Sequence, residues 1–109
     1  MTSTLPYKLL ADAIEDIDAV SSFIAEDNPD AALRFIEKIF SAIEYVVSFP
    51  HLGHINEKIA DAHIRFYAIY EYFVVYAPDS RPLTIIAIVH GRRNPNFIAA
   101  MLREREERN

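Results

Sequence analysis

The residues best suited to chemistry lie in one short run, His90-Gly91-Arg92-Arg93-Asn94-Pro95, late in the chain. An imidazole can move a proton near neutral pH, and two guanidiniums can bind a phosphate in bidentate fashion or stabilise a pentacovalent phosphate. Arg65 is expected on a strand beside the one that ends at His90, so it could join this basic cluster. The alternative is structural. Arg92 and Arg93 would then pair with acidic helices, His90 would be a satisfied strand-end residue, and Arg65 would simply face solvent.

Other candidate groups carry less chemistry. Six tyrosines, four of them between Tyr67 and Tyr76, could stack on bases or anchor a protein interface, but they also suit sheet packing with surface hydroxyls. His51 and His54 have an H-x-x-H spacing but flank Leu52-Gly53 in an expected loop, and the chain has no cysteine. No serine elbow, glycine-rich phosphate loop or zinc signature is present. We therefore expect neither a metal nor a cofactor.

Length and composition predict one globular domain over residues 1–109. The chain is 51% hydrophobic and 25% charged, with two glycines, and its net charge is −5. Residues 1–59 contain four Lys/Arg and ten Asp/Glu, a charge of −6, whereas residues 60–109 contain seven Arg and six Asp/Glu, a charge of +1. An acidic chain is a poor general binder of nucleic acid, so any such contact would be local.

Two further absences bear on location. The N-terminal residues do not read as a basic region followed by an apolar run, and no segment approaches the roughly 18 apolar residues that span a bilayer. We expect a cytoplasmic protein without membrane contact.

The first half of the chain predicts a strand followed by two helices. Residues 7–10, at the end of an apolar run that begins at Leu5, predict an edge strand. A helix should follow, with Asp12 as its N-cap and the acidic run Glu15-Asp16-Asp18 on a solvated face. This helix must stop near Asn28-Pro29, where Asn28 can cap a second helix that continues to Ser48. The two helices predict an αα-hairpin.

The second half predicts a sheet. After a surface loop over residues 50–61, the runs Ile64–Ala68, Tyr72–Ala77 and Leu83–His90 are rich in β-branched and aromatic residues, which favours an antiparallel meander. Residues 84–89 are almost wholly apolar and predict the central strand. Beyond Pro95 the spacing predicts a short C-terminal helix. The fold class is therefore α+β: an N-terminal edge strand, an αα-hairpin, a three-stranded antiparallel meander and a short C-terminal helix.

Three phrases at the junctions of these elements carry a family resemblance. They are Ala25-Glu26-Asp27-Asn28-Pro29-Asp30-Ala31-Ala32-Leu33-Arg34-Phe35, Phe49-Pro50-His51-Leu52-Gly53-His54 and Ile88-Val89-His90-Gly91-Arg92-Arg93. With the order of elements, the sequence resembles the ParE-like branch of the RelE/ParE toxin superfamily over nearly the whole chain. The resemblance implies the toxin of a type II toxin–antitoxin system, neutralised by a cognate antitoxin that would also provide any contact with DNA.

The resemblance also suggests a target. ParE-like members poison DNA gyrase, whereas RelE-like members cut messenger RNA on the ribosome with several basic residues and a C-terminal tyrosine. In this chain the candidates for such a nuclease site, or for target binding, reduce to Arg65, His90, Arg92 and Arg93, and no tyrosine follows Tyr76. Gyrase inhibition, which needs no enzymatic activity in the toxin, is therefore favoured. A ribosome-dependent endoribonuclease and a non-toxic protein-binding homologue remain as alternatives.

Overall fold

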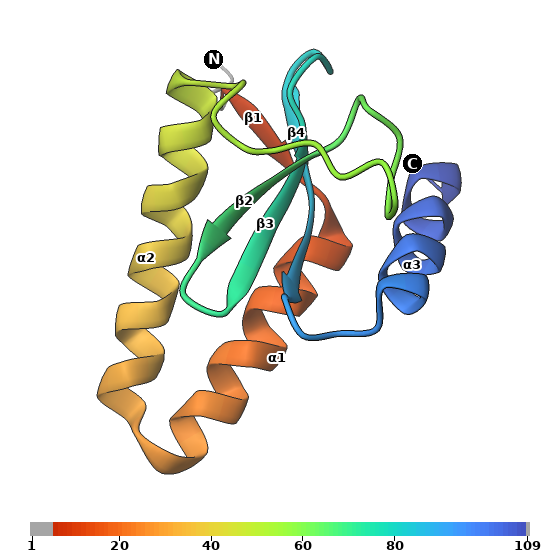
Figure 1. The fold of residues 1–109 in the computed structure, drawn as a ribbon. Helices are drawn as coiled ribbons and strands as arrows, with labels where there is room; N and C mark the ends of the chain where they lie inside the picture. The colour runs from red at the N-terminus through yellow and green to blue at the C-terminus, as the bar shows by residue number, and fades with distance from the viewer. Residues whose placement is uncertain (1–5, 109) are drawn as a thin grey trace.

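The computed structural model describes residues 6–108 and has the α+β architecture expected from the sequence (Figure 1). Leu5 and both ends of the expected 1–109 domain lie outside the described residues. Of the helices described, none has the length and apolarity needed to cross a membrane. In chain order the elements are β1 (Tyr7–Leu9), α1 (Ala11–Asp27), α2 (Pro29–Ser48), β2 (Arg65–Ile69), β3 (Tyr72–Ala77), β4 (Leu83–His90) and α3 (Pro95–Arg108).

The helical hairpin turns at the predicted place, but its first helix begins differently. Asn28 has extended backbone angles, and its side chain accepts a hydrogen bond from the Ala31 N–H at 3.1 Å, with Pro29 as the first residue of α2. The prediction that Asp12 caps α1 is wrong, because Leu10 occupies that position. Leu10 donates its N–H to Ile85 O in the sheet, so α1 starts directly from the strand and Asp12 falls within its first turn.

The strands form one sheet in the order β1-β4-β3-β2. The predicted meander is confirmed, since β2, β3 and β4 pair antiparallel in succession, while β1 lies parallel to β4 at one edge. The strand β4, predicted to be central, lies between β1 and β3 and is buried over most of its length. The register sets His90 opposite Tyr72 at one end of the sheet, and Arg65 opposite Tyr76 at the other.

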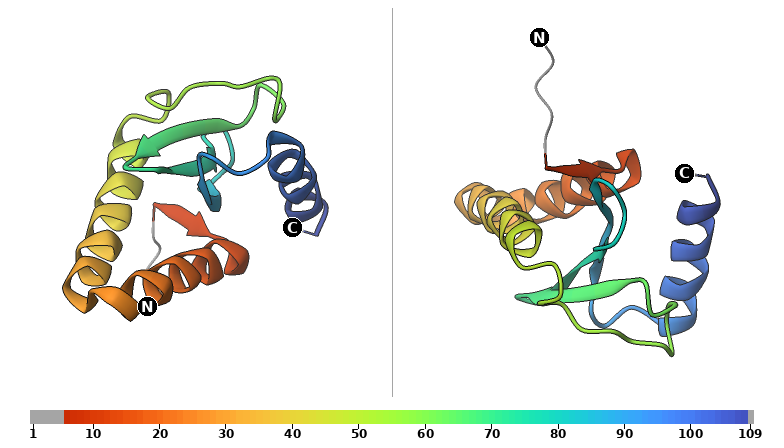
Figure 2. Two further views of the ribbon diagram at one scale, coloured as in Figure 1. Left: turned by 60° about the horizontal axis from the view of Figure 1, so that its bottom comes forward. Right: turned by 90° about the horizontal axis from the view of Figure 1, so that it is seen from above.

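The core lies between the sheet and the helical hairpin. Ile39, Ile43 and Val46 of α2 are fully buried, as are Val74 and Ile85 of the sheet. Figure 2 shows α1 and α2 together on one side of the sheet and α3 apart from them, beside β4. Burial of these aliphatic side chains is the main source of stability, at about 25 cal/mol per Å² of apolar surface removed from water.

The helix α3 is longer than expected, because charged side chains attach its second half to the rest of the fold. Arg105 donates to both carboxylate oxygens of Asp16, at 2.6 and 2.9 Å, and to Ile86 O at 3.1 Å. Asp16 also accepts the Ile88 N–H at 2.9 Å. The prediction that Asp16 belongs to a solvated helix face is therefore wrong. Since β1 ends opposite Ile85, these two side chains satisfy the β4 edge where no strand follows.

Candidate protein-binding site

The imidazole of His90 is engaged through both ring nitrogens. Nδ1 accepts the N–H of Arg92 at 3.0 Å, which places the ring proton on Nε2, and Nε2 lies 3.4 Å from a carboxylate oxygen of Glu71. The Tyr72 ring packs edge-on against the imidazole, with the centroids 5.0 Å apart. These contacts match the structural alternative considered for His90. They fix the backbone turn that follows β4 and occupy Nδ1, whereas Nε2 has only the 3.4 Å approach to the Glu71 carboxylate, which is 72% exposed.

Arg92 and Arg93 are exposed beyond this turn. Within residues 6–108 neither side chain forms an ion pair, and Arg93 lies over the Phe97 ring at 4.7 Å from its centroid. The idea that they pair with acidic residues of the hairpin is therefore wrong, because Asp16 pairs with Arg105 and Asp12 pairs with Arg108. Both guanidiniums keep their donors free for a partner outside the chain.

Arg105 is not among the residues predicted from the sequence to have a role, although a local signal for it is present. Arg105 follows the buried residues Ile98 and Leu102 at helical spacing, so all three share the face of α3 that meets the sheet. A charged residue on such a face needs a partner. Its partner, Asp16, keeps the pKa of Arg105 above its ordinary value through their hydrogen bonds.

The expectation that Arg65 lies next to the strand of His90 is wrong. Its strand, β2, borders β3 rather than β4, and the register places it at the opposite end of the sheet. There its guanidinium donates to His51 O at 3.1 Å and to Gly53 O at 2.7 Å. Arg65 thus holds the loop that follows α2, and the structure separates it from His90, Arg92 and Arg93.

The hydroxyl of Tyr76, in β3, holds the same loop through two hydrogen bonds. The Tyr76 hydroxyl accepts the Gly53 N–H at 2.8 Å and donates to Pro50 O at 2.8 Å. Burial of the ring raises the pKa of Tyr76 above its ordinary value. A Cβ added at Gly53 would lie 2.7 Å from the hydroxyl oxygen, so only glycine fits there. The first part of the predicted surface loop is therefore a fixed structure with a buried residue, Gly53.

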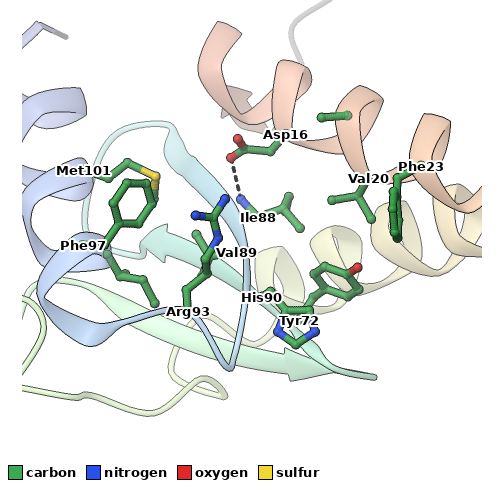
Figure 3. A pocket seen from close by; sticks show the side chains of 12 residues that line it. Asp16, Val20, Phe23, Tyr72, Ile88, Val89, His90, Arg93, Phe97 and Met101 are labelled. Atoms are coloured by element: carbon green, nitrogen blue, oxygen red, sulfur yellow. Dashed lines mark hydrogen bonds between the residues drawn. The ribbon is translucent and has the colours of Figure 1, made fainter.

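A groove of about 260 Å³ opens between α1, α3 and the end of β4, and we call it the α1–α3 groove (Figure 3). Phe23 of α1 is 70% exposed on one side and Phe97 of α3 is 49% exposed on the other. Arg93 lines the groove, and so does Asp16, whose carboxylate accepts the Ile88 N–H. The remaining lining is Ala19, Val20, Tyr72, Val89, His90, Ile98 and Met101.

The groove has the composition of a protein-binding surface. Exposed aromatic side chains and arginine are the residues that contribute most to binding energy in interfaces. An apolar segment with acidic residues at its side would bury Phe23 and Phe97 while pairing with Arg93. Among the residues that the structure describes, no group of three or more His, Asp or Glu side chains is placed to hold a metal ion.

Three comparisons with known proteins relate this chain to the same class of protein. The "Putative toxin Y4kP" of Sinorhizobium fredii (strain NBRC 101917 / NGR234) is 26% identical over 81 residues, 74% of this chain and 82% of that protein. A chain from the solved chromosomal ParDE TA system of P. aeruginosa shares the fold, with a TM-score of 0.64 at 15% identity over 77% of this chain and 92% of that one. Residues 7–95 match the family described as the ParE toxin of the type II toxin–antitoxin system, parDE. The chain therefore belongs to the ParE toxin family of type II toxin–antitoxin systems.

Proposed function

We propose that this ParE-family toxin acts in the cytoplasm by inhibiting DNA gyrase, and that a cognate antitoxin neutralises it by binding in the α1–α3 groove. The observation that carries the proposal is where the side chains of the four candidate residues lie and what they contact; the four are Arg65, His90, Arg92 and Arg93. His90 uses Nδ1 to hold a backbone N–H and Arg65 holds a loop at the other end of the sheet, so within residues 6–108 the four candidates are not assembled into one acid–base set. A protein with free arginines but no such set is suited to binding rather than to RNA cleavage.

Target contact is assigned to Arg92 and Arg93. In the described part of the chain their guanidiniums form no ion pair, although Arg93 lies over the Phe97 ring, and both follow the end of a largely buried strand. In this proposal His90 supports them indirectly, because its Nδ1 holds the Arg92 N–H. Arg65 supports the loop at residues 50–54 instead. An antitoxin segment in the groove would cover Arg93, which lines it, and would block the target sterically.

The target is tested with purified toxin and gyrase. Addition of the toxin should stop DNA supercoiling and accumulate cleaved DNA, and expression without antitoxin should cause DNA damage and filamentation while messenger RNA stays intact. Arg92→Glu and Arg93→Glu should weaken inhibition by about tenfold or more each, because each change replaces an attractive contact with a repulsive one. Arg103→Glu, also exposed but on α3, is the matched control. Rapid transcript cleavage with active gyrase would favour the endoribonuclease alternative, and harmless expression would favour the non-toxic one.

Antitoxin binding is tested separately. Phe23→Ser should weaken the complex by about 2 kcal/mol or more, since truncating a central aromatic anchor commonly costs that much. Leu33→Ser is the matched control, because Leu33 is 62% exposed on α2 and does not line the α1–α3 groove. Equal effects of the two changes on the Kd would contradict the assignment of the groove.

A further inference from the structure

A second surface, unrelated to the α1–α3 groove, lies between α2 and the outer edge of the sheet. It is a groove of about 450 Å³ between the exposed side of α2 and the strand β2, and we call it the α2–β2 groove. The two grooves have no lining residue in common. The residues of the α2–β2 groove that matter here are Lys38, Ser41, Glu44 and Tyr45 of α2, with Tyr67 and Ile69 of β2.

The strand β2 leaves backbone groups unused along this groove. Phe66 exchanges both of its backbone hydrogen bonds with His54, at 2.8 and 2.9 Å, on the side away from β3. Because backbone groups alternate in direction along an antiparallel strand, the N–H and C=O of Ala68 point to this same side. Within residues 6–108 no backbone or side-chain partner meets either group, and Ala68 is exposed. Since His54 already occupies this side of β2 at Phe66, Ala68 is the position at which another strand can pair.

The charged residues Lys38 and Glu44 are placed so that α2 of one copy is complementary to α2 of a second copy. Lys38 and Glu44 stand six residues apart, about 9 Å along the helix axis, with Ser41 midway between them. If a second α2 lies antiparallel across a two-fold axis at Ser41, each Lys38 comes level with the Glu44 of the other copy. A small residue at the crossing point allows the helices to approach closely. Self-complementarity of this kind is what a two-fold interface requires.

Aromatic rings supply the apolar part of this surface. Tyr45 is 49% exposed, and its ring packs edge-on against Tyr67 with the centroids 6.2 Å apart. Tyrosines are among the residues enriched at protein interfaces, because one side chain offers both apolar area and a hydroxyl. The pair lies beside both Ser41 and the free edge of β2, so one partner can contact all of these features together.

We propose that the α2–β2 groove binds a second copy of this chain, with β2 pairing antiparallel to its equivalent near Ala68 and Lys38 of each copy facing Glu44 of the other. The sheet then continues through the two-fold axis. The α1–α3 groove and the arginines beyond β4 take no part in this contact, so the proposal stands apart from the proposed function.

The test uses charge reversal in the full-length chain, followed by sedimentation equilibrium. Lys38→Glu and Glu44→Lys should each weaken the dimer by about tenfold or more, because each variant faces its own copy with like charges. A mixture of the two variants restores both pairs and should dimerise within about threefold of the unmodified chain. Glu37→Lys, exposed on α2 but outside the groove, is the control and should leave the Kd unchanged.

A second readout does not depend on the variants. Amide hydrogen exchange at Ala68 should slow as the protein concentration rises, because pairing removes its N–H from water. Circular dichroism spectra establish that each variant is folded. A monomer at all accessible concentrations, a dimer that ignores both charge reversals, or exchange at Ala68 that does not change with concentration would overturn the proposal.

Discussion

Replacing Asp16 with alanine removes one carboxylate that accepts three hydrogen bonds from two distant parts of the chain. Its oxygens receive the Ile88 N–H at 2.9 Å and two guanidinium N–H groups of Arg105 at 2.6 and 2.9 Å. The side chains of Asp16 and Arg105 are 18% and 11% exposed, so water reaches this pair poorly. The variant leaves the Ile88 N–H without its acceptor and removes the two-pronged ion pair between Asp16 and Arg105.

The size of the effect follows from these two losses. An unpaired buried N–H costs about 1–3 kcal/mol, and removing one member of a buried ion pair costs about 3–5 kcal/mol. Arg105 can turn toward water, because it stands in the last turn of α3, and this movement recovers part of the cost. We therefore expect Asp16→Ala to lower the free energy of unfolding by about 3 kcal/mol, which is a large share of the stability of a small domain.

Urea unfolding followed by circular dichroism measures this change. With a urea dependence of about 2 kcal/mol per molar, the midpoint should fall by about 1.5 M. Arg105→Met should destabilise by about 2 kcal/mol, since Asp16 then keeps the Ile88 N–H as its donor. The double variant should cost clearly less than the sum, by about 1.5 kcal/mol, because both single changes remove the same contact.

A matched control and a refuting result complete the test. Asp18→Ala removes an exposed acid one half-turn away on the same helix and should shift the free energy by about 0.5 kcal/mol or less. If Asp16→Ala had an effect as small as that of Asp18→Ala, or if its effect and that of Arg105→Met were additive, the ion pair between Asp16 of α1 and Arg105 of α3 would not be a stabilising contact.

Three further outcomes concern local contacts, and denaturant unfolding measures each. Gly53→Ala should destabilise by about 2 kcal/mol, because the new Cβ would lie 2.9 Å from a ring carbon of Tyr76 and 3.0 Å from Phe66 O; an unchanged midpoint would contradict this. Tyr76→Phe should cost about 2 kcal/mol by leaving Gly53 N–H and Pro50 O unpaired. Since the pKa of Tyr76 is raised above 10.0 in the fold, the unfolded chain ionises first, so stability should fall as pH rises above 10.0, and less steeply in Tyr76→Phe than in the unmodified chain. Asn28→Ala should cost about 1 kcal/mol through loss of the cap on α2, whereas Asn28→Asp should cost little.

Features encoded by neighbouring residues were predictable from the sequence. Asn28-Pro29 contains both the end of one helix and the cap of the next, so the hairpin turn was placed correctly. The bounds of β3 and β4 agree with the predicted runs, because each run is flanked by turn residues. The start of α1 was not predictable in this way, because Leu10 takes over from Asp12 through a hydrogen bond to Ile85, far along the chain.

In the candidate site, too, the features set by neighbouring residues were predictable and those set by distant contacts were not. The run from His90 to Arg93 was correctly placed at a strand end, since a buried strand and a following glycine are local signals. The misplacement of Arg65 arose because a local pattern does not state the order of strands in the sheet. The ion pair between Asp16 and Arg105 joins residues 89 positions apart, and only the assembled fold brings them together.

The ion pair that attaches α3 to α1 joins two residues that are translated at different times. Among the elements in residues 6–108, α3 is synthesised last, and Arg105 is translated 89 residues later than Asp16. At about 5–20 residues per second, several seconds separate the two partners. Until Arg105 has been added, the edge of β4 at Ile86 and Ile88 has no cover from α3. One wall of the α1–α3 groove, which we propose as the antitoxin site, is therefore supplied by the element that is synthesised last among those described.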